Sequence, residues 1–222
     1  MHEALRDEVC RMNIEIARLG LAAWTSGNVS GRDPASGLVV IKPSGVLYAD
    51  LRPDTLVVVD LEGRVVQGDL RPSVDTATHL AIYRSRPDVG GVAHTHSPYA
   101  TSFAALGQSI PACLTTLAME FGGDVPVGAY VPIGGEAIGR EVLRVAGRSP
   151  AVLMRVHGVF TCGATATAAL KAAAMLEEAA LTVHLALLRG QPETLPPEEV
   201  ERCYRYYHES YGQQTPASLP EV

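Results

Sequence analysis

Short runs of aliphatic residues alternate along this chain with longer segments of helical periodicity. The runs LVVI (38–41) and TLVVVD (55–60) have the length and the valine content that strands favour. Residues 3–19 instead repeat apolar side chains at alternating steps of four and three, which is typical of one face of an amphipathic helix. This alternation predicts an α/β sandwich, and no GxGxxG motif indicates a dinucleotide-binding sheet.

The rest of the chain extends the pattern. The segment LEGR joins residues 55–60 to VVQG as a hairpin, whereas TSGNVSGRDPASG (25–37) is predicted to be a loop. Strands are predicted at GGVAHTH (90–96), within GGDVPV, and at AVLMRVHG, which ends in a histidine. Helices are predicted over residues 74–84, 98–106, 135–146 and 164–189, and from Pro197 onward. Residues 1–213 then form a single domain, and residues 214–222 a flexible C-terminal tail.

The composition limits the partners that the protein can take. Its 222 residues carry a net charge of −6 and no basic cluster longer than two residues, so a nucleic-acid partner is not expected. The charged N-terminus and the absence of a long apolar run predict neither a signal peptide nor a membrane span, and therefore a cytoplasmic location. Four scattered cysteines are expected to be buried free thiols in a reducing compartment: Cys10, Cys113, Cys162 and Cys203.

Three histidines stand at the ends of predicted strands. His94 and His96 are spaced i, i+2, so both side chains point to one face of a strand and can converge on a single atom. His157 ends another predicted strand. Three neutral imidazoles suit a zinc-like ion with a fourth position left open for catalysis. The alternative is a hydrogen-bonded polar edge without a metal.

Asp75 lies in the first turn of the helix predicted over residues 74–84, and His79 follows it by one helical turn on the same face. Asp75 is either a ligand or base at the metal, or a first-turn carboxylate that the helix dipole favours. His79 is interpreted as a structural partner or as a partner in the outer shell of the site.

Three short segments rich in glycine and serine are candidates for binding an anion. They are SGN (26–28), PSG (43–45) and PS (72–73). Backbone N–H groups and hydroxyls in such segments can bind a phosphate, although ordinary turns use the same residues. Their repetition in one chain indicates a phosphorylated substrate.

Several of these segments together resemble the class II aldolase and L-ribulose-5-phosphate 4-epimerase family. The matching segments follow the family's order from about residue 3 to residue 213: TSGNVS, IKPSGV, RPSVDTATH, HTHS, GQSIPA, VHG and YGQ. The resemblance is closest to the epimerases, because IKPSGV, GQSIPA, the terminal YGQ and Asp75 are epimerase-like. The aldolases usually carry a glutamate where this chain has Asp75.

The resemblance implies a three-layer α/β/α sandwich with a central, largely antiparallel sheet. It also implies a divalent metal ion, usually zinc with manganese or cobalt as alternatives, held by His94, His96 and His157 with Asp75 as a further metal or catalytic residue. The phosphate of a ketose phosphate would be bound by Gly27, Asn28, Lys42, Ser44, Gly45 and Ser73. Val74 stands where the epimerases often have a second serine. Members are typically homotetramers with four-fold symmetry and active sites at subunit interfaces.

The implied chemistry is a retro-aldol reaction. A metal that chelates the C2 carbonyl and C3 hydroxyl oxygens lets the C3–C4 bond break to leave an enediolate. If the glycolaldehyde phosphate fragment rotates and recombines, L-ribulose 5-phosphate becomes D-xylulose 5-phosphate. If the fragment leaves, the same machinery is an aldolase.

Inversion needs a proton donor or acceptor on each face of the aldehyde. The resemblance implies that a tail tyrosine, matched by Tyr211, serves one face in a neighbouring subunit's site, and that an aspartate serves the other. Met119 occupies the position of that aspartate. The adjacent Glu120 could supply the carboxylate or could be a surface or interface acid, and Tyr211 could instead pack as an aromatic residue of the last helix.

Two other interpretations stay open. Met119 and the shorter segment between Gly123 and His157 favour an aldolase, similar to fuculose-1-phosphate aldolase, or a decarboxylase that acts on another sugar phosphate. The third interpretation is a non-catalytic interaction module similar to the adducin head. That module lacks the metal ligands, whereas all three histidines are present here.

Overall fold

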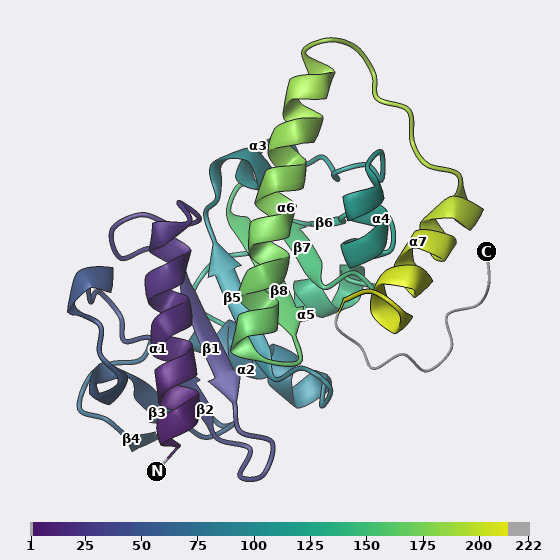
Figure 1. Ribbon diagram of the computed structural model, residues 1–222. Helices are drawn as coiled ribbons and strands as arrows, with labels where there is room; N and C mark the ends of the chain where they lie inside the picture. The colour runs from purple at the N-terminus through teal and green to yellow at the C-terminus, as the bar shows by residue number, and fades with distance from the viewer. Residues whose placement is uncertain (1, 213–222) are drawn as a thin grey trace.

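One eight-stranded sheet forms the centre of the computed structural model, which describes residues 2–212 (Figure 1). Neighbouring strands are antiparallel, except that the edge strand β6 is parallel to β7. The order across the sheet is β4 (Val65–Gln67), β3 (Val57–Val59), β2 (Val39–Ile41), β1 (Asn28–Arg32), β5 (Gly91–Thr95), β8 (Gly158–Gly163), β7 (Ala151–Met154) and β6 (Val127–Gly128).

Helices cover both faces of this sheet (Figure 1). On one face lie α1 (Glu3–Arg18), α3 (Pro98–Leu106) and α6 (Ala166–Leu187), and on the other lie α2 (Thr76–Ser85) and α5 (Ala137–Val145). The helices α4 (Thr115–Phe121) and α7 (Pro197–Glu209) pack against each other, and α4 also contacts α6. Short 3-10 turns, η1 (Tyr48–Asp50) and η2 (Pro53–Thr55), connect β2 to β3. The predicted three-layer α/β/α sandwich with a largely antiparallel sheet is confirmed.

Alternation along the strands supplies both apolar layers. Val40 and Val58 pack beneath α1 and α6, whereas Val39 and Val59 face the layer formed by α2 and α5. A strand that is buried on both faces needs apolar residues at every position, which explains the uninterrupted valine runs.

The prediction of a loop over residues 25–37 was wrong, because this segment contains β1 between β2 and β5. Its sequence NVSGR has little strand propensity, but small residues are required where α1 crosses the strand. A Cβ atom at Gly31 would lie 2.8 Å from Leu5 and 2.9 Å from Val9. Packing in the folded protein therefore outweighed local propensity.

The segment AVLMRVHG was predicted as one strand, and this was also wrong. β7 ends at Met154, residues 155–157 form a turn, and β8 begins at Gly158. Val156 has a left-handed φ of 51°, which interrupts the strand. His157 thus lies in a hairpin turn. The short helix α4 was not predicted, because seven residues are too few to show a helical period.

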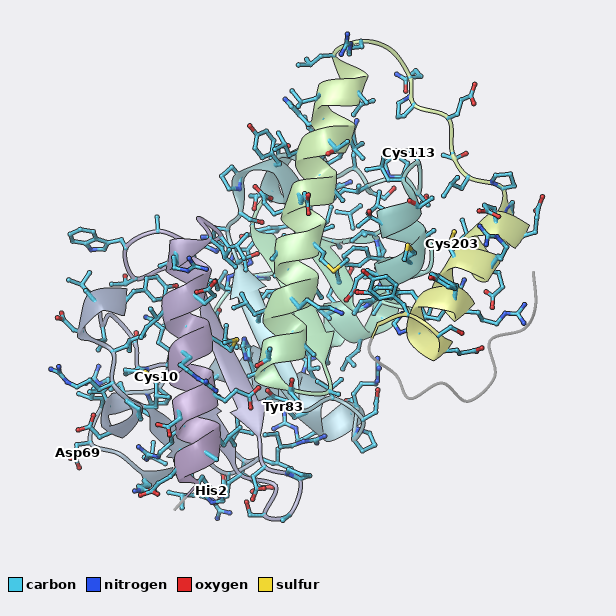
Figure 2. All side chains as sticks on the ribbon, viewed as in Figure 1. His2, Cys10, Asp69, Tyr83, Cys113 and Cys203 are labelled. Carbon is cyan, nitrogen blue, oxygen red and sulfur yellow. The ribbon has the colours of Figure 1, made fainter. Side chains whose placement is uncertain are left out.

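All four cysteines are free thiols, as predicted, but only Cys10 on α1 and Cys203 on α7 are buried as expected, whereas Cys113 and Cys162 are partly buried (Figure 2). Over residues 2–212, no helix combines the length and apolar character that a bilayer crossing requires. The single domain over residues 1–213 stays a prediction. The predicted tail, residues 214–222, lies outside the described residues.

Gly91→Ala should destabilise the fold, because the start of α6 lies directly on β5. A Cβ atom at Gly91 would lie 2.1 Å from the carbonyl oxygen of Thr165, and only a backbone shift can relieve that contact. We expect the free energy of unfolding, measured by urea denaturation, to fall by about 3 kcal/mol. Gly190→Ala is the matched control, since a Cβ atom there has nothing within 4 Å. Equal stability of the two variants would contradict this packing.

Candidate active site

One cavity, at the end of β5 where His94 and His96 lie, brings together most of the predicted site residues. It has a volume of about 330 Å³. Its walls come from the segment before β1, the segment after β2, the start of α2 and the β7–β8 turn. The lining residues are Thr25, Ser26, Gly27, Asn28, Lys42, Pro43, Ser44, Gly45, Ser73, Val74, Asp75, His94, His96, Ile133 and His157.

The three predicted histidines form a cluster in this cavity, with one ring nitrogen of each within 4.8 Å of the others. The Nε2 atoms of His94 and His96 are 3.0 Å apart, as their i, i+2 spacing on one face of β5 allows. The Nδ1–H of His94 donates to the carbonyl oxygen of Val159 at 2.9 Å, because a carbonyl can only accept. Nε2 of His94 therefore carries the lone pair on the side of the cluster.

The β7–β8 turn delivers His157 to the cluster. Val156 holds its left-handed conformation while its N–H donates to the carbonyl oxygen of Ala104. Gly158 follows, and a Cβ atom there would lie 2.8 Å from Cδ2 of His96. The absence of a side chain at Gly158 lets the turn lie against the end of β5.

The donor set fits a divalent metal ion. Burial lowers the pKa of His94 to about 3 and lowers the pKa of both His96 and His157, so at neutral pH the rings are in the neutral form that metals bind. Nδ1 of His157 is buried and has no hydrogen-bond partner among the described residues. Two nitrogen ligands of a tetrahedral ion lie about 3.3 Å apart, near the 3.0 Å between the Nε2 atoms of His94 and His96. His96 is exposed, which leaves a side of the cluster open to a substrate.

Asp75 lies in the same cavity but outside the group that the three histidines form. Its carboxylate accepts a hydrogen bond from Nδ2 of Asn28 at 2.7 Å. Burial raises its pKa, but interaction with His94 and His79 and the hydrogen bond from Asn28 outweigh burial, so the net pKa is lowered. The carboxylate is ionised at neutral pH and can accept a proton or a hydrogen bond beside the cluster.

The predicted anion-binding segments PSG and PS lie side by side. The N–H of Ser73 donates to the carbonyl oxygen of Lys42 at 3.0 Å, and the N–H of Ser44 donates to that of Arg71 at 2.9 Å. Gly45 follows with a left-handed φ of 72°. These contacts place two serines and a glycine turn on one wall of the cavity, an arrangement that suits a phosphate.

Gly27, Asn28 and Lys42 contribute the adjoining wall. A Cβ atom at Gly27 would lie 2.8 Å from the carbonyl oxygen of His94, so only glycine permits this approach. The buried Lys42 ammonium donates to the carbonyl oxygen of Thr25 at 3.2 Å. Burial lowers the pKa of Lys42, and Asp75 partly opposes that shift. Because its direct partners are carbonyl oxygens, the Lys42 charge is available to an anionic ligand.

Glu120 and Tyr211 do not line the cavity of their own chain. Glu120 is buried beneath α6, with its carboxylate 3.1 Å from Nζ of Lys171. Lys171 also donates to the hydroxyl of Tyr207 at 3.1 Å, and the ring of Tyr207 lies 5.1 Å from that of the exposed Tyr211. The two predicted acid–base residues thus belong to one cluster between α4, α6 and α7.

Two residues of the site were missed. Ile133 lines the cavity from the loop after β6, and an apolar residue beside two glycines carries no sequence signal for that position. Phe160 stacks on His94 with ring centroids 4.2 Å apart and planes 10° apart. Its place three residues after His157 would have indicated this contact if β8 had been predicted.

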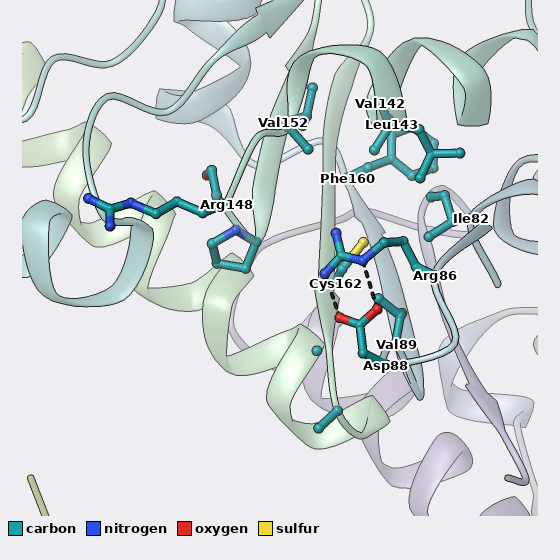
Figure 3. Close-up of a pocket in the computed structure, with 15 residues that line it drawn as sticks. Ile82, Arg86, Asp88, Val89, Val142, Leu143, Arg148, Val152, Phe160 and Cys162 are labelled. Carbon is teal, nitrogen blue, oxygen red and sulfur yellow. Dashed lines mark hydrogen bonds and ion pairs between the residues drawn. The ribbon is translucent and has the colours of Figure 1, made fainter. Parts of the chain in front are cut away.

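A second cavity, of about 230 Å³, lies at the opposite end of β5 and β8 (Figure 3). Arg86 and Asp88 in its wall pair with each other at 2.6 Å. Burial raises the pKa of the neighbouring Cys162 thiol to about 12, so the thiol stays protonated. Within residues 2–212 the group of side chains suited to a metal is the histidine cluster, and this second cavity has none.

A three-layer sandwich with a three-histidine cluster at the end of a central strand suits an α/β enzyme that binds a metal ion. Over residues 7–184 the chain matches the model of the Class II Aldolase and Adducin N-terminal domain, and it belongs to this family. The L-ribulose-5-phosphate 4-epimerase UlaF of Salmonella paratyphi C (strain RKS4594) is 39% identical over 221 residues, which cover 95% of this chain and 96% of the relative.

Solved structures agree with this assignment. An L-fuculose 1-phosphate aldolase superimposes with a TM-score of 0.89 at 28% identity, covering 94% of this chain and 98% of that one. The l-fuculose-1-phosphate aldolase from Thermus thermophilus superimposes with a TM-score of 0.71 at 26% identity, covering 86% and 98% of the two chains. Both curated epimerases and solved aldolases of the family are therefore similar to this chain over most of its length.

His94→Ala should abolish metal binding, because it removes the buried ligand whose orientation Val159 fixes. We expect about one divalent ion per chain in the wild type, measured by elemental analysis after zinc loading, and an affinity lower by roughly a hundredfold or more in the variant. His184→Ala, which changes a histidine of α6 outside the cavity, is the control. Retention of the ion by His94→Ala, or its loss from both variants, would contradict the site.

Proposed function

We propose that this protein is a metal-dependent epimerase that converts L-ribulose 5-phosphate to D-xylulose 5-phosphate. The observation that carries the proposal is the near full-length similarity to the epimerase UlaF, at 39% identity. It is supported by the cavity in which the histidine cluster adjoins the two serine segments and Lys42. Zinc is the proposed metal, since three imidazoles with one open position suit it, and manganese or cobalt are the alternatives.

Each wall of the cavity has a proposed role in this reaction. Bound at the three histidines, a divalent ion would act as a Lewis acid on the ketose C2 and C3 oxygens and stabilise the charge that develops when the C3–C4 bond breaks. Ser44, Ser73 and Lys42, on two adjoining walls, would hold the phosphate, which fixes the reacting carbon relative to the cluster. Asp75, ionised and held by Asn28, would accept the hydroxyl proton beside the ion.

Inversion requires groups that reach the aldehyde fragment from both sides, and we propose Tyr211 and Glu120 for this role in the site of another subunit. Neither side chain lines the cavity of its own chain. Met119 occupies the position that matches the aspartate of the epimerases, so Glu120 would have to release its contact with Lys171 to act.

A homotetramer with sites at subunit interfaces is part of the proposal. Four large apolar side chains stand exposed on or beside the segments that line the cavity, and a single chain would leave them in water: Trp24, Val74, Ile133 and Val156. Trp24 is 78% exposed and also has a left-handed φ of 61°. A second copy of the chain seated over the cavity would bury this surface and bring another copy's α7 toward the site.

The second candidate is a class II aldolase that releases the aldehyde fragment. Met119 in place of an acid and the TM-score of 0.89 to an L-fuculose 1-phosphate aldolase favour it. A non-catalytic module similar to the adducin head is disfavoured by the intact histidine cluster. For any of these functions, four free thiols support a cytoplasmic location.

Incubation of the zinc-loaded protein with L-ribulose 5-phosphate separates the candidates. We expect D-xylulose 5-phosphate to form without release of glycolaldehyde phosphate, and little cleavage of L-fuculose 1-phosphate. Tyr211→Phe should lower kcat about a hundredfold, because it removes one proton donor. Tyr206→Phe, an exposed tyrosine of α7, is the control. Net cleavage instead of epimerisation would favour the aldolase, and no conversion by metal-loaded protein would contradict the proposal.

Subunit mixing tests the interface sites. Chains with His94→Ala and chains with Tyr211→Phe are each expected to have little activity alone. Co-expressed with two affinity tags and purified as mixed oligomers, they should regain about a quarter of the wild-type rate, since one site in four pairs an intact cluster with an intact tyrosine. Mixed oligomers with no gain in activity would show that Tyr211 does not act in a neighbouring subunit.

A further inference from the structure

A histidine outside the metal cluster is fully buried beneath the active site. His79 lies on α2 one turn after Asp75, and its backbone N–H donates to the backbone carbonyl oxygen of Asp75 at 3.0 Å. Its Nδ1 is 2.7 Å from Oγ of Ser30 on β1. That hydroxyl is in turn 2.8 Å from the hydroxyl of Tyr83, which lies one turn further along α2. The side chains of Tyr83, Ser30 and His79 thus form a buried hydrogen-bonded relay. Its last member, His79, lies one helical turn after Asp75.

Counting protons decides the direction of the relay. If Tyr83 donates to Ser30 and Ser30 donates to His79 Nδ1, each hydroxyl proton has an acceptor, and the ring proton sits on Nε2. In the reverse direction Nδ1–H donates to Ser30, which donates to Tyr83, and the Tyr83 proton has no second acceptor among the described residues. The first direction leaves one buried group without a partner, the Nε2–H of His79, whereas the reverse leaves two, the Tyr83 hydroxyl proton and the Nε2 lone pair, so the first direction is favoured.

At neutral pH the His79 ring is neutral and carries a single N–H proton, so a proton on Nε2 leaves Nδ1 as an acceptor. Burial lowers the pKa of His79 to about 4, with the charge of Asp75 acting against that shift. Nε2 is buried and has no hydrogen-bond partner among residues 2–212. The charged group that influences His79 is therefore the Asp75 carboxylate, one turn before it on the same helix face.

Packing prevents the ring from turning away. Phe160 meets His79 edge-on, with ring centroids 6.0 Å apart, and at the same time stacks on His94 at 4.2 Å. Two sets of contacts therefore fix the rotamer of His79: its hydrogen bond to Ser30 and its packing against Phe160, which also stacks on His94.

We propose that His79 is a positioning residue for Asp75: the Tyr83–Ser30 relay fixes its Nε2–H tautomer, and this N–H dipole, together with Asn28, holds the Asp75 carboxylate oriented toward the cluster. The proposal rests on the role proposed for Asp75 in catalysis. Its physical core, the tautomer and its effect on Asp75, does not depend on which ketose phosphate is the substrate.

Nitrogen NMR of the zinc-loaded protein tests the tautomer without any substrate. We expect the 15N shifts of His79 to report a protonated Nε2 and an unprotonated Nδ1, and Ser30→Ala to give a mixture of tautomers. A wild-type ring protonated on Nδ1, or a Ser30→Ala ring that keeps a single tautomer, would overturn the proposal. This result stands even if the protein does not epimerise L-ribulose 5-phosphate.

A matched pair of substitutions tests the action on Asp75. His79→Gln can keep an N–H near the place of Nε2, whereas His79→Leu has a similar volume and none. We expect His79→Leu to shift the 13C resonance of the Asp75 carboxyl and to lower kcat about ten- to a hundredfold with KM nearly unchanged, and His79→Gln to recover most of both. Equal effects of the two variants would indicate packing alone and overturn the proposal.

A double-mutant cycle completes the test. If His79 acts through Asp75, His79→Leu should change kcat by less than about threefold in an Asp75→Asn background, because the carboxylate is already gone. If His79→Leu still lowers kcat by the full ten- to hundredfold in the Asp75→Asn background, His79 acts by a route other than Asp75. If Asp75→Asn has no measurable turnover, the 13C shift of the Asp75 carboxyl in the single variant His79→Leu decides instead. Thermal unfolding confirms that each variant is folded.

Discussion

The register of β5 between β1 and β8 is the constraint on which the site depends. In that register Asn28 lies opposite His94 on one side, and Phe160 lies opposite His94 on the other. One pairing places the amide that holds Asp75, and the other places the ring that stacks on the histidine. A slip of one residue would turn His94 to the opposite face of the sheet, so the hydrogen bonds of the ladder also set the geometry of the histidine cluster.

Burial of the site residues sets their chemistry as much as their identity does. An imidazole in water is partly protonated near neutral pH. His94 instead stays neutral, because it is buried on the central strand β5 and burial lowers its pKa. Asp75 experiences the same burial but stays charged, because Asn28 donates to it and histidines surround it. The pKa of His94 and the pKa of Asp75 are thus both lowered. The result is a neutral imidazole, which is the form that binds a metal, and an ionised carboxylate, which can accept a proton.

Much of this arrangement could be predicted from the sequence. The valine runs and helical stripes predicted the sandwich, and the i, i+2 spacing of His94 and His96 predicted a shared face. β1 could not be predicted, because Gly31 and its neighbours are chosen for the close approach of α1 and not for strand propensity. The turn that carries His157 depends on a left-handed valine, a conformation that no local pattern signals. The location of Glu120 and Tyr211 away from the cavity follows from how α4 and α7 pack, which periodicity does not encode.

The hairpin that carries His157 brings a distant part of the chain to the histidines at the end of β5. Two histidines of the cluster come from the end of β5, and the third comes from the β7–β8 turn, far along the chain, so an ion bound at the cluster would close a long loop as a covalent cross-link does. An ion bound there would therefore stabilise the folded chain as well as act on a substrate.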